Sequence, residues 1–211
     1  MIKRAISKNY FHWEPSIDGR IYDQRLVNKY LKENQTPEES ALDPEDIDTK
    51  ILVYEDRVKT WFLDIAKKLK KNNEAGFVIL SIAIAYIEGN QQFREGKTSN
   101  KRGRSPKFFI RGMRRIFNKE HVAENILKEF YHQVRCGLFH NGMTGNKVSI
   151  SGQLPVPIRN DGYAIDINPH KFLDKIISDF KDYIIQLKNP SNLKDRENFE
   201  KRYNLGEGYG K

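Results

Sequence analysis

The chain of 211 residues contains one cysteine, Cys136, and has no apolar run long enough to cross a bilayer. A single cysteine excludes an internal disulfide framework and leaves a cysteine-based zinc site without enough ligands. The longest apolar stretch, residues 75–87, is interrupted by Gly76 and Ser81, whereas a membrane span needs about 20 apolar residues. The basic N-terminus lacks the apolar segment of a secretory signal. We therefore expect a cytoplasmic protein with no membrane partner.

Acidic residues are fewer than basic ones, and the two kinds are unevenly placed along the chain. The 37 Lys and Arg residues against 28 Asp and Glu residues give a formal net charge of +9, which favours an anionic partner such as a nucleic acid. Residues 94–119 are strongly basic, and Glu95 is their only acidic neighbour. Residues 32–56 are acidic and include the run TPEESALDPEDID, which predicts an exposed loop. A less favoured alternative is that this loop covers the basic stretch.

Apolar residues recur at helical spacing over most of the chain, which predicts four long helices and one short one. The second of them is apolar nearly all round and should lie at the centre of the fold. Ser105 and Pro106 are typical of an N-cap and a first helical position, and Asn141-Gly142 is typical of a helix end. The predicted helices lie at about residues 51–69, 74–93, 105–117, 120–140 and 169–188.

These elements favour an all-α fold, an antiparallel four-helix bundle with a small β-hairpin excursion at about residues 147–166, before the last helix. Residues 1–50 are expected to form an N-terminal extension with the acidic loop, and residues 51–188 the helical domain. Residues 189–211 are polar and are expected to form a C-terminal tail.

Side chains suited to RNA chemistry gather near the end of the fourth predicted helix, in the run YHQVRCGLFHNG. Arg135 supplies a permanently charged fork for phosphate oxygens, and His140 can exchange a proton near neutral pH. His132 and Asn141 are possible supporting groups, and Glu88 could orient Arg135 or His140 from a neighbouring helix. Because no carboxylate cluster accompanies them, we expect cleavage of RNA without a metal ion or another cofactor.

The run from Arg135 to His140, an arginine and a histidine separated by four residues at a helix end, resembles the HEPN superfamily. Four stretches between about residues 80 and 186 look closest to plasmid- and defence-associated HEPN proteins: SIAIAYIEGNQQFREGKTSN, KFFIRGMRRIF, EFYHQVRCGLFHNG and INPHKFLDKIISDFKDYI. The resemblance implies a four-helix core of HEPN type, a homodimer and metal-independent endoribonuclease activity of toxin or antiphage-defence type. It also implies an antitoxin or regulatory protein as a partner, and it places the family's catalytic pair on Arg135 and His140.

The position of Arg135 and His140 raises a geometric question. Residues five apart differ by about 140° around a regular α-helix, so the two side chains would not face each other. Either the helix is distorted near Gly137, or the site is shared between two copies of the chain. A rival pattern is the spacing of His132, Cys136 and His140 by four, which would suit a metal site or a Cys-His nucleophile pair.

The basic stretch is the other candidate functional feature. Its Lys and Arg residues are interleaved with Phe109, Met113, Ile116 and Phe117, which should form the buried face of the third helix. The alternative is a solvated face without a ligand. We expect the following side chains to bind RNA: Lys101, Arg102, Arg104, Lys107, Arg111, Arg114 and Arg115.

Two other functional classes remain open from the sequence. One is a non-catalytic HEPN-type module that binds RNA or a protein through the same basic surface. The other is a basic scaffold or DNA-binding protein in which Arg135 and His140 have no joint role.

Overall fold

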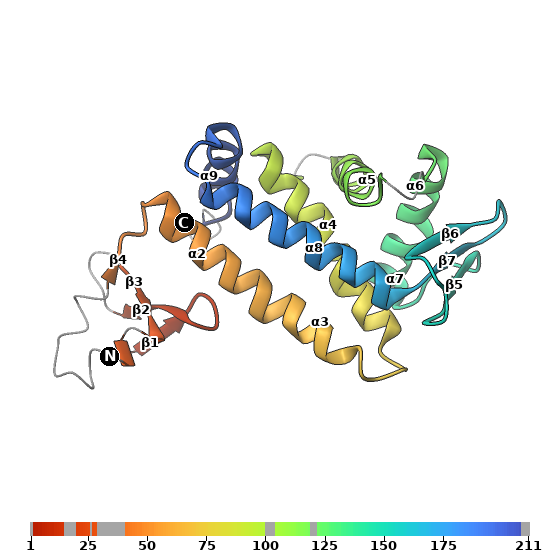
Figure 1. The fold of residues 1–211 in the computed structure, drawn as a ribbon, viewed down its shortest axis with the longest axis horizontal. Helices are drawn as coiled ribbons and strands as arrows, with labels where there is room; N and C mark the ends of the chain where they lie inside the picture. Colours follow the sequence, from red (N-terminus) through yellow and green to blue (C-terminus); the bar gives the residue numbers. More distant parts are fainter. Residues whose placement is uncertain are drawn as a thin grey trace.

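The computed structural model describes residues 2–14, 20–25, 27–28, 41–99, 104–118 and 122–207, and most of these are helical. The predicted mostly helical fold is therefore confirmed. In Figure 1 a four-stranded sheet lies at one end of the molecule and a three-stranded sheet at the other, with the helices between them. Within the described ranges, every helix is too short or too polar to span a bilayer.

Helix α4 (Gly76–Glu95) is the central element, as its apolar surface predicts. It packs against α5 (Arg104–Ile116), α8 (Pro169–Lys188) and α9 (Leu193–Glu207). Its buried side chains occupy several faces, and Gly96 ends it in the left-handed conformation that suits glycine. The fully buried residues of α4 include Ile79, Leu80, Ala83, Ile84 and Ile87.

Three consecutive segments form a second long rod beside α8 (Figure 1). They are α2 (Ile47–Val58), the π-helical segment η2 (Lys59–Leu63) and α3 (Asp64–Leu69). The predicted helix at about residues 51–69 is confirmed, but it starts four residues earlier. Asp46 caps it by accepting a hydrogen bond from the Thr49 amide, so the end of the acidic run initiates a helix.

Helix α5 approaches α4 closely because Gly112 has no side chain. A Cβ at this position would lie 2.7 Å from Ile87 Cγ2 and 3.0 Å from the Ile87 carbonyl oxygen. The helix begins at Arg104, so the prediction of Ser105 as its N-cap is wrong. Ser105 instead lies in the first turn and faces α4, which matters for the site below.

The N-terminal residues form a sheet that the sequence did not predict. Its strands are all antiparallel, in the order β1 (Ile2–Ala5), β2 (Tyr10–Glu14), β3 (Ile21–Asp23) and β4 (Ala41–Leu42). Asp56 on α2 holds the first turn, because its carboxylate accepts from Ser7 Oγ at 2.6 Å and from the Asn9 amide at 2.9 Å. The expected extension is thus a folded sheet in its described part. Residues 29–40 of the acidic region lie outside the described residues.

The β-excursion is a mixed sheet rather than the predicted hairpin alone. Strand β7 (Ile165–Ile167) lies at its centre, parallel to β5 (Val148–Ile150) and antiparallel to β6 (Ile158–Asn160). The hairpin joins β6 to β7, whereas the two segments with clear alternation, β5 and β7, pair in parallel. Strand β6, which lies between β5 and β7 in the sequence, lets these two strands run parallel. The prolines around β6 made it hard to recognise in the sequence.

The expectation of a C-terminal tail is wrong for residues 193–207, which form α9. This helix presents few apolar residues, so its periodicity is weak, but Phe199 is fully buried. The Phe199 ring lies 5.5 Å from Phe93 on α4 and 5.3 Å from Tyr54 on α2. Two aromatic contacts therefore fix a helix that is polar over most of its surface.

Candidate functional site

The helix that carries Arg135 is distorted, as one of the two geometric alternatives requires. It consists of α6 (Glu124–Phe130), the π-helical segment η4 (Tyr131–Cys136) and α7 (Gly137–Asn141). Hydrogen bonds in a π-helix join residues five apart, so the angle for a regular helix does not apply around Arg135. Gly142, with φ of 68°, ends α7 and confirms the predicted helix end.

The chain that follows α7 folds back over this distorted segment. The Gly145 amide donates a hydrogen bond of 2.7 Å to the Gln133 carbonyl. The returning backbone passes so close to Gly137 that a Cβ there would lie 2.6 Å from the Met143 carbonyl oxygen. Gly137 is thus required by close contact, and the returning chain stabilises η4 and α7 together.

Arg135 is joined to a neighbouring helix through Glu88. Its Nη2 donates to Glu88 Oε2 at 3.0 Å, and both side chains are mostly buried. The same carboxylate oxygen accepts a hydrogen bond from Ser105 Oγ at 2.8 Å, and Ser105 Oγ lies 3.1 Å from the Tyr131 hydroxyl. Glu88 on α4 therefore fixes both α5 and η4, and the contact between Glu88 and Arg135, one of the two predicted for this glutamate, is present.

Two aromatic rings flank the Arg135 guanidinium. Its central carbon lies 5.5 Å from the centre of the Tyr131 ring and 4.9 Å from that of Phe139, and the Phe139 side chain is 50% exposed. These rings stand four residues before and after Arg135, a helical spacing from which they could have been predicted. Neither Nε nor Nη1 of Arg135 makes a hydrogen bond to any residue that the structure describes. We name Glu88, Ser105, Tyr131, Arg135 and Phe139 the Arg135 cluster.

The remaining predicted site residues lie at the surface around this cluster. His140 and Asn141 are exposed in the last turn of α7, and in the described part of the chain His140 makes no hydrogen bond or ion pair with Arg135 or Glu88. His132 is also exposed, with its ring edge-on to Tyr131 at 5.5 Å. The structure thus joins Glu88 to Arg135 and leaves the histidines facing solvent.

The rival metal site receives no support from the geometry. Among the described residues, no three His, Cys, Asp or Glu side chains lie close enough together to hold a metal ion. His132 and Cys136 belong to η4 and His140 to α7, so the change of helix type between them disturbs the spacing by four on which the pattern depends.

The basic stretch is only partly available for binding. Lys101 and Arg102 lie outside the described residues. Arg111 donates to both oxygens of Glu95, at 2.7 and 2.8 Å, and Arg114 donates to Glu124 at 2.5 Å. In the described part of the chain Arg104 and Lys107 have no acidic partner, and Lys107 is exposed to solvent.

Arg115 lies apart from the other predicted RNA-binding residues, contrary to the prediction. It points into the bundle, where its three nitrogens donate to Gln91, Asn90 and the Asp179 carboxylate. Arg94 on α4 reaches the same groups, with Nε donating to Asn90 at 2.8 Å and Nη2 donating to Asp179 at 3.4 Å. We name these residues, with Tyr86, the Asp179 network: Tyr86, Asn90, Gln91, Arg94, Arg115 and Asp179.

The Asp179 network joins three helices and keeps a buried phenol neutral. The Tyr86 hydroxyl donates to Asp179 Oδ2 at 2.8 Å. Burial raises the pKa of Tyr86 well above its ordinary value, and the Asp179 carboxylate raises it further. Burial also raises the pKa of Tyr54, to about 12, where its hydroxyl accepts a hydrogen bond from Asn90.

The Arg135 cluster is therefore the described group with the strongest features of an anion-binding site. A guanidinium is held in place from one side, flanked by an exposed aromatic ring, and followed one turn later by an exposed histidine. No family model matches the chain, and no curated protein or solved structure matches it.

Proposed function

We propose that this protein is a metal-independent endoribonuclease of toxin or antiphage-defence type, with Arg135 and His140 as its catalytic residues. The observation that carries the proposal is the state of the Arg135 guanidinium. Glu88 holds it through one nitrogen, and the other two make no hydrogen bond to any described residue. Arginine can donate hydrogen bonds to phosphate oxygens through such free nitrogens.

The reaction follows from these groups. The 2′-oxygen of a ribose attacks the adjacent phosphorus, and the bond from phosphorus to the 5′-oxygen breaks. His140 accepts the 2′ proton or donates a proton to the leaving 5′-oxygen, and Arg135 stabilises the negative charge that develops on the phosphorane. The products are a 2′,3′-cyclic phosphate and a 5′-hydroxyl. Glu88 is a positioning residue in this scheme, because it touches Arg135 and not the RNA.

The proposal includes a homodimer, which exposed apolar residues beside the cluster support. On α4, the side chains of Val78 and Ala85 are exposed. They lie on the same helix face as Gly89, the residue that follows Glu88. Phe62 is 46% exposed and lines a pocket of about 310 Å³ that also includes Ala85 and Gly89. Burial of this face against a second copy would bring two Arg135 clusters together. Because η4 is distorted, the angle between Arg135 and His140 no longer requires a site shared by two chains. The exposed apolar face is therefore the observation that supports the homodimer.

The fold proposed for this activity is a HEPN-type core of four helices. The rod from α2 to α3, helix α4, the distorted helix from α6 to α7, and α8 would supply them. Helices α5 and α9 and the two sheets would then be additions to that core. An antitoxin or regulatory protein partner, which the resemblance implies, stays a prediction.

The experiment that tests the activity compares wild type, Arg135→Ala and His140→Ala with end-labelled RNA in EDTA. We expect wild type to release fragments with a 2′,3′-cyclic phosphate, and either variant to lose this activity while keeping its circular dichroism spectrum. Activity that strictly requires added Mg²⁺ or Zn²⁺ would contradict the mechanism. Light scattering should give about twice the 24.8 kDa chain mass.

The second candidate is a non-catalytic module that binds RNA or a protein, and one observation favours it. His140 makes no hydrogen bond or ion pair with Arg135 or Glu88 within the described ranges, so neither residue holds it in a catalytic position in the single chain. If wild type binds RNA with an affinity that depends on Arg135 and never cleaves it, this candidate replaces the first.

A further inference from the structure

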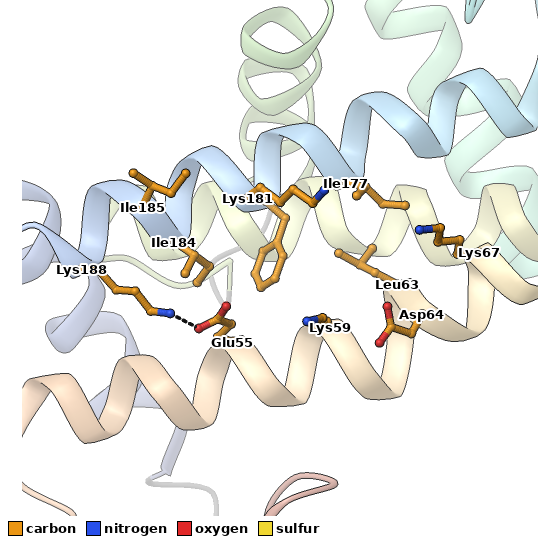
Figure 2. A pocket seen from close by; sticks show the side chains of 11 residues that line it. Glu55, Lys59, Leu63, Asp64, Lys67, Ile177, Lys181, Ile184, Ile185 and Lys188 are labelled. Atoms are coloured by element: carbon orange, nitrogen blue, oxygen red, sulfur yellow. Dashed lines mark ion pairs between the residues drawn. The ribbon is translucent and has the colours of Figure 1, made fainter.

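A groove with an apolar floor lies on elements that contribute nothing to the Arg135 cluster. It runs between the rod from α2 to α3 and helix α8, as Figure 2 shows, and has a volume of about 490 Å³. Leu63 comes from the rod and Phe180 and Ile184 from α8, and all three are buried, so they form a floor rather than a rim. Ile177 and the exposed Ile185 extend the apolar surface along α8.

Lysines surround this floor, and most of them lack a partner. Lys59 and Lys67 stand on the rod and Lys181 on α8, and in the described part of the chain none of the three makes an ion pair. Lys188 pairs with Glu55 across the groove at 2.5 Å (Figure 2). With Asp64 the groove holds four basic and two acidic side chains, which leaves an excess of two positive charges.

The groove continues beyond the pair of Lys188 and Glu55. A second depression shares Lys188 and extends along α2 to Asp48, between Leu52 and Pro190. From Asp48 to Lys67 the rod spans roughly 28 Å at the helical rise of about 1.5 Å per residue. Two hollows that follow one another along this length suit an elongated segment of protein better than a small molecule.

We propose that this groove binds an amphipathic helix of a partner protein, with carboxylates along both edges of the helix's apolar stripe. Apolar side chains one turn apart would contact Leu63, Ile177 and Ile184, as in other complexes in which a helix fills a groove. Carboxylates on the flanks would meet Lys59, Lys67 and Lys181, which line both sides.

Nucleic acid fits this surface less well. Its phosphates would meet Glu55 and Asp64 inside the groove, and its bases would need an exposed aromatic face, whereas Phe180 is buried. Binding to an apolar floor is favourable when the ligand covers it with apolar groups that also leave water. The inference goes beyond the proposed nuclease activity, because the groove and the Arg135 cluster share no residue.

The test uses two synthetic helical peptides as probes. Both carry the same stripe of leucines, flanked in one by glutamates and in the other by lysines. Fluorescence anisotropy with the full chain should show that the acidic peptide binds at least about tenfold more tightly than the basic one. The triple variant Lys59→Glu, Lys67→Glu and Lys181→Glu should abolish or invert this preference, whereas the control with Lys171→Glu and Lys194→Glu, two exposed lysines outside the groove, should keep it.

Several results would overturn the proposal. They are equal affinity for the two peptides, absence of binding by both, or an unchanged preference in the triple variant. Binding of single-stranded RNA, or of vesicles of phosphatidylserine and phosphatidylcholine, that the triple variant loses while peptide binding persists would assign the groove to that ligand instead. Because the Arg135 cluster is untouched, the triple variant should cleave RNA like wild type, so failure of the groove proposal and failure of the nuclease proposal are distinguishable.

Discussion

The Asp179 network and the Arg135 cluster both join an arginine to a carboxylate of another helix, and they differ in how many donors of the arginine are used. In the Asp179 network, every nitrogen of Arg94 and of Arg115 donates to a side chain of the protein. In the Arg135 cluster only one nitrogen does, within the part of the chain that the structure describes. In the Asp179 network the protein itself uses the guanidinium donors, whereas in the Arg135 cluster some donors remain that could bind a phosphate.

The exposed fraction of the side chain does not distinguish Arg115 from Arg135. Arg115 has a slightly more exposed side chain than Arg135, 27% against 21%, yet its hydrogen bonds are all internal. A sequence shows only that both are arginines on amphipathic helices. The number of donors left free therefore distinguishes the two better than burial does.

The largest difference between the clusters should appear on removal of an arginine. Arg135→Ala should lower the rate of RNA cleavage by about 10²–10³-fold, as is typical when a preorganised donor to a developing charge is lost. Its free energy of unfolding should fall by only about 1 kcal/mol, since one hydrogen bond is lost. Cleavage assays and urea unfolding measure the two effects. Arg159→Ala, which breaks a surface ion pair with Asp166, is the control and should keep its activity; equal loss in both variants would contradict the assignment.

The opposite pattern is expected for the Asp179 network. Asp179→Asn removes the carboxylate with which both Arg94 and Arg115 pair, and it should lower the free energy of unfolding by about 3 kcal/mol. The folded fraction should cleave RNA at the wild-type rate. Asp182→Asn, at an exposed position on the same helix, serves as the matched control. A stable Asp179→Asn protein would show that the network is not structural.

Glu88→Gln tests the positioning role within the Arg135 cluster. Glutamine can still accept a hydrogen bond but lacks the charge that holds the guanidinium, so we expect cleavage to fall by about tenfold, chiefly in kcat. Unfolding by urea should change by no more than about 0.5 kcal/mol. Glu95→Gln gives the comparison at a carboxylate that is less buried, 23% exposed against 13% for Glu88. A large loss of stability without loss of kcat would make Glu88 a structural residue like Asp179.

Alkaline pH should lower the free energy of unfolding through Tyr54, whose hydroxyl accepts a hydrogen bond from Asn90 of the Asp179 network. Tyr54 has a folded pKa of about 12 against an ordinary value near 10, so the unfolded chain loses this proton first. Stability is then fully present below about pH 10 and falls by about 1.4 kcal/mol per pH unit up to about pH 12. Urea midpoints at several pH values, with Tyr54→Phe as control, measure the effect. If the variant shows the same slope, other groups cause it.

The smallest effect concerns the basic stretch. Lys107→Glu should weaken RNA binding modestly and reduce the slope of log affinity against log salt by about 1, because Lys107 has no acidic partner within the described ranges. Arg114→Glu should change the slope less, since Glu124 already neutralises Arg114. Titrations at several salt concentrations measure the two slopes. Equal slopes for the two variants would contradict the expected difference between Lys107 and Arg114.

The sequence predicted those parts of the fold whose apolar periodicity is strong. The helices that became α4 and α8 were placed within a few residues, because each buries a regular set of side chains. The N-terminal sheet has strands too short to show alternation, and α9 depends on Phe199 and a few neighbours that no periodic pattern reveals.

The site was predictable to the same degree. The spacing of Arg135 and His140 and the position of Glu88 at the end of an apolar helix identified the elements that meet. Ser105 could not be assigned, because its role depends on how closely α5 approaches α4 at Gly112. Arg115 was misplaced because its partners, Asn90 and Asp179, lie on two other helices.

The π-helical segment around Arg135 also sets the phase between the two halves of its helix. A turn closed by residues five apart holds one residue more than a turn closed by residues four apart. Deletion of His132 would remove that extra residue, so the turn could close as a regular α-helix and both halves would keep their rotation relative to each other. A one-residue deletion inside a regular helix such as α4 or α8 instead rotates the part before it by about 100° relative to the part after it, so a change of length has opposite consequences in the two kinds of helix.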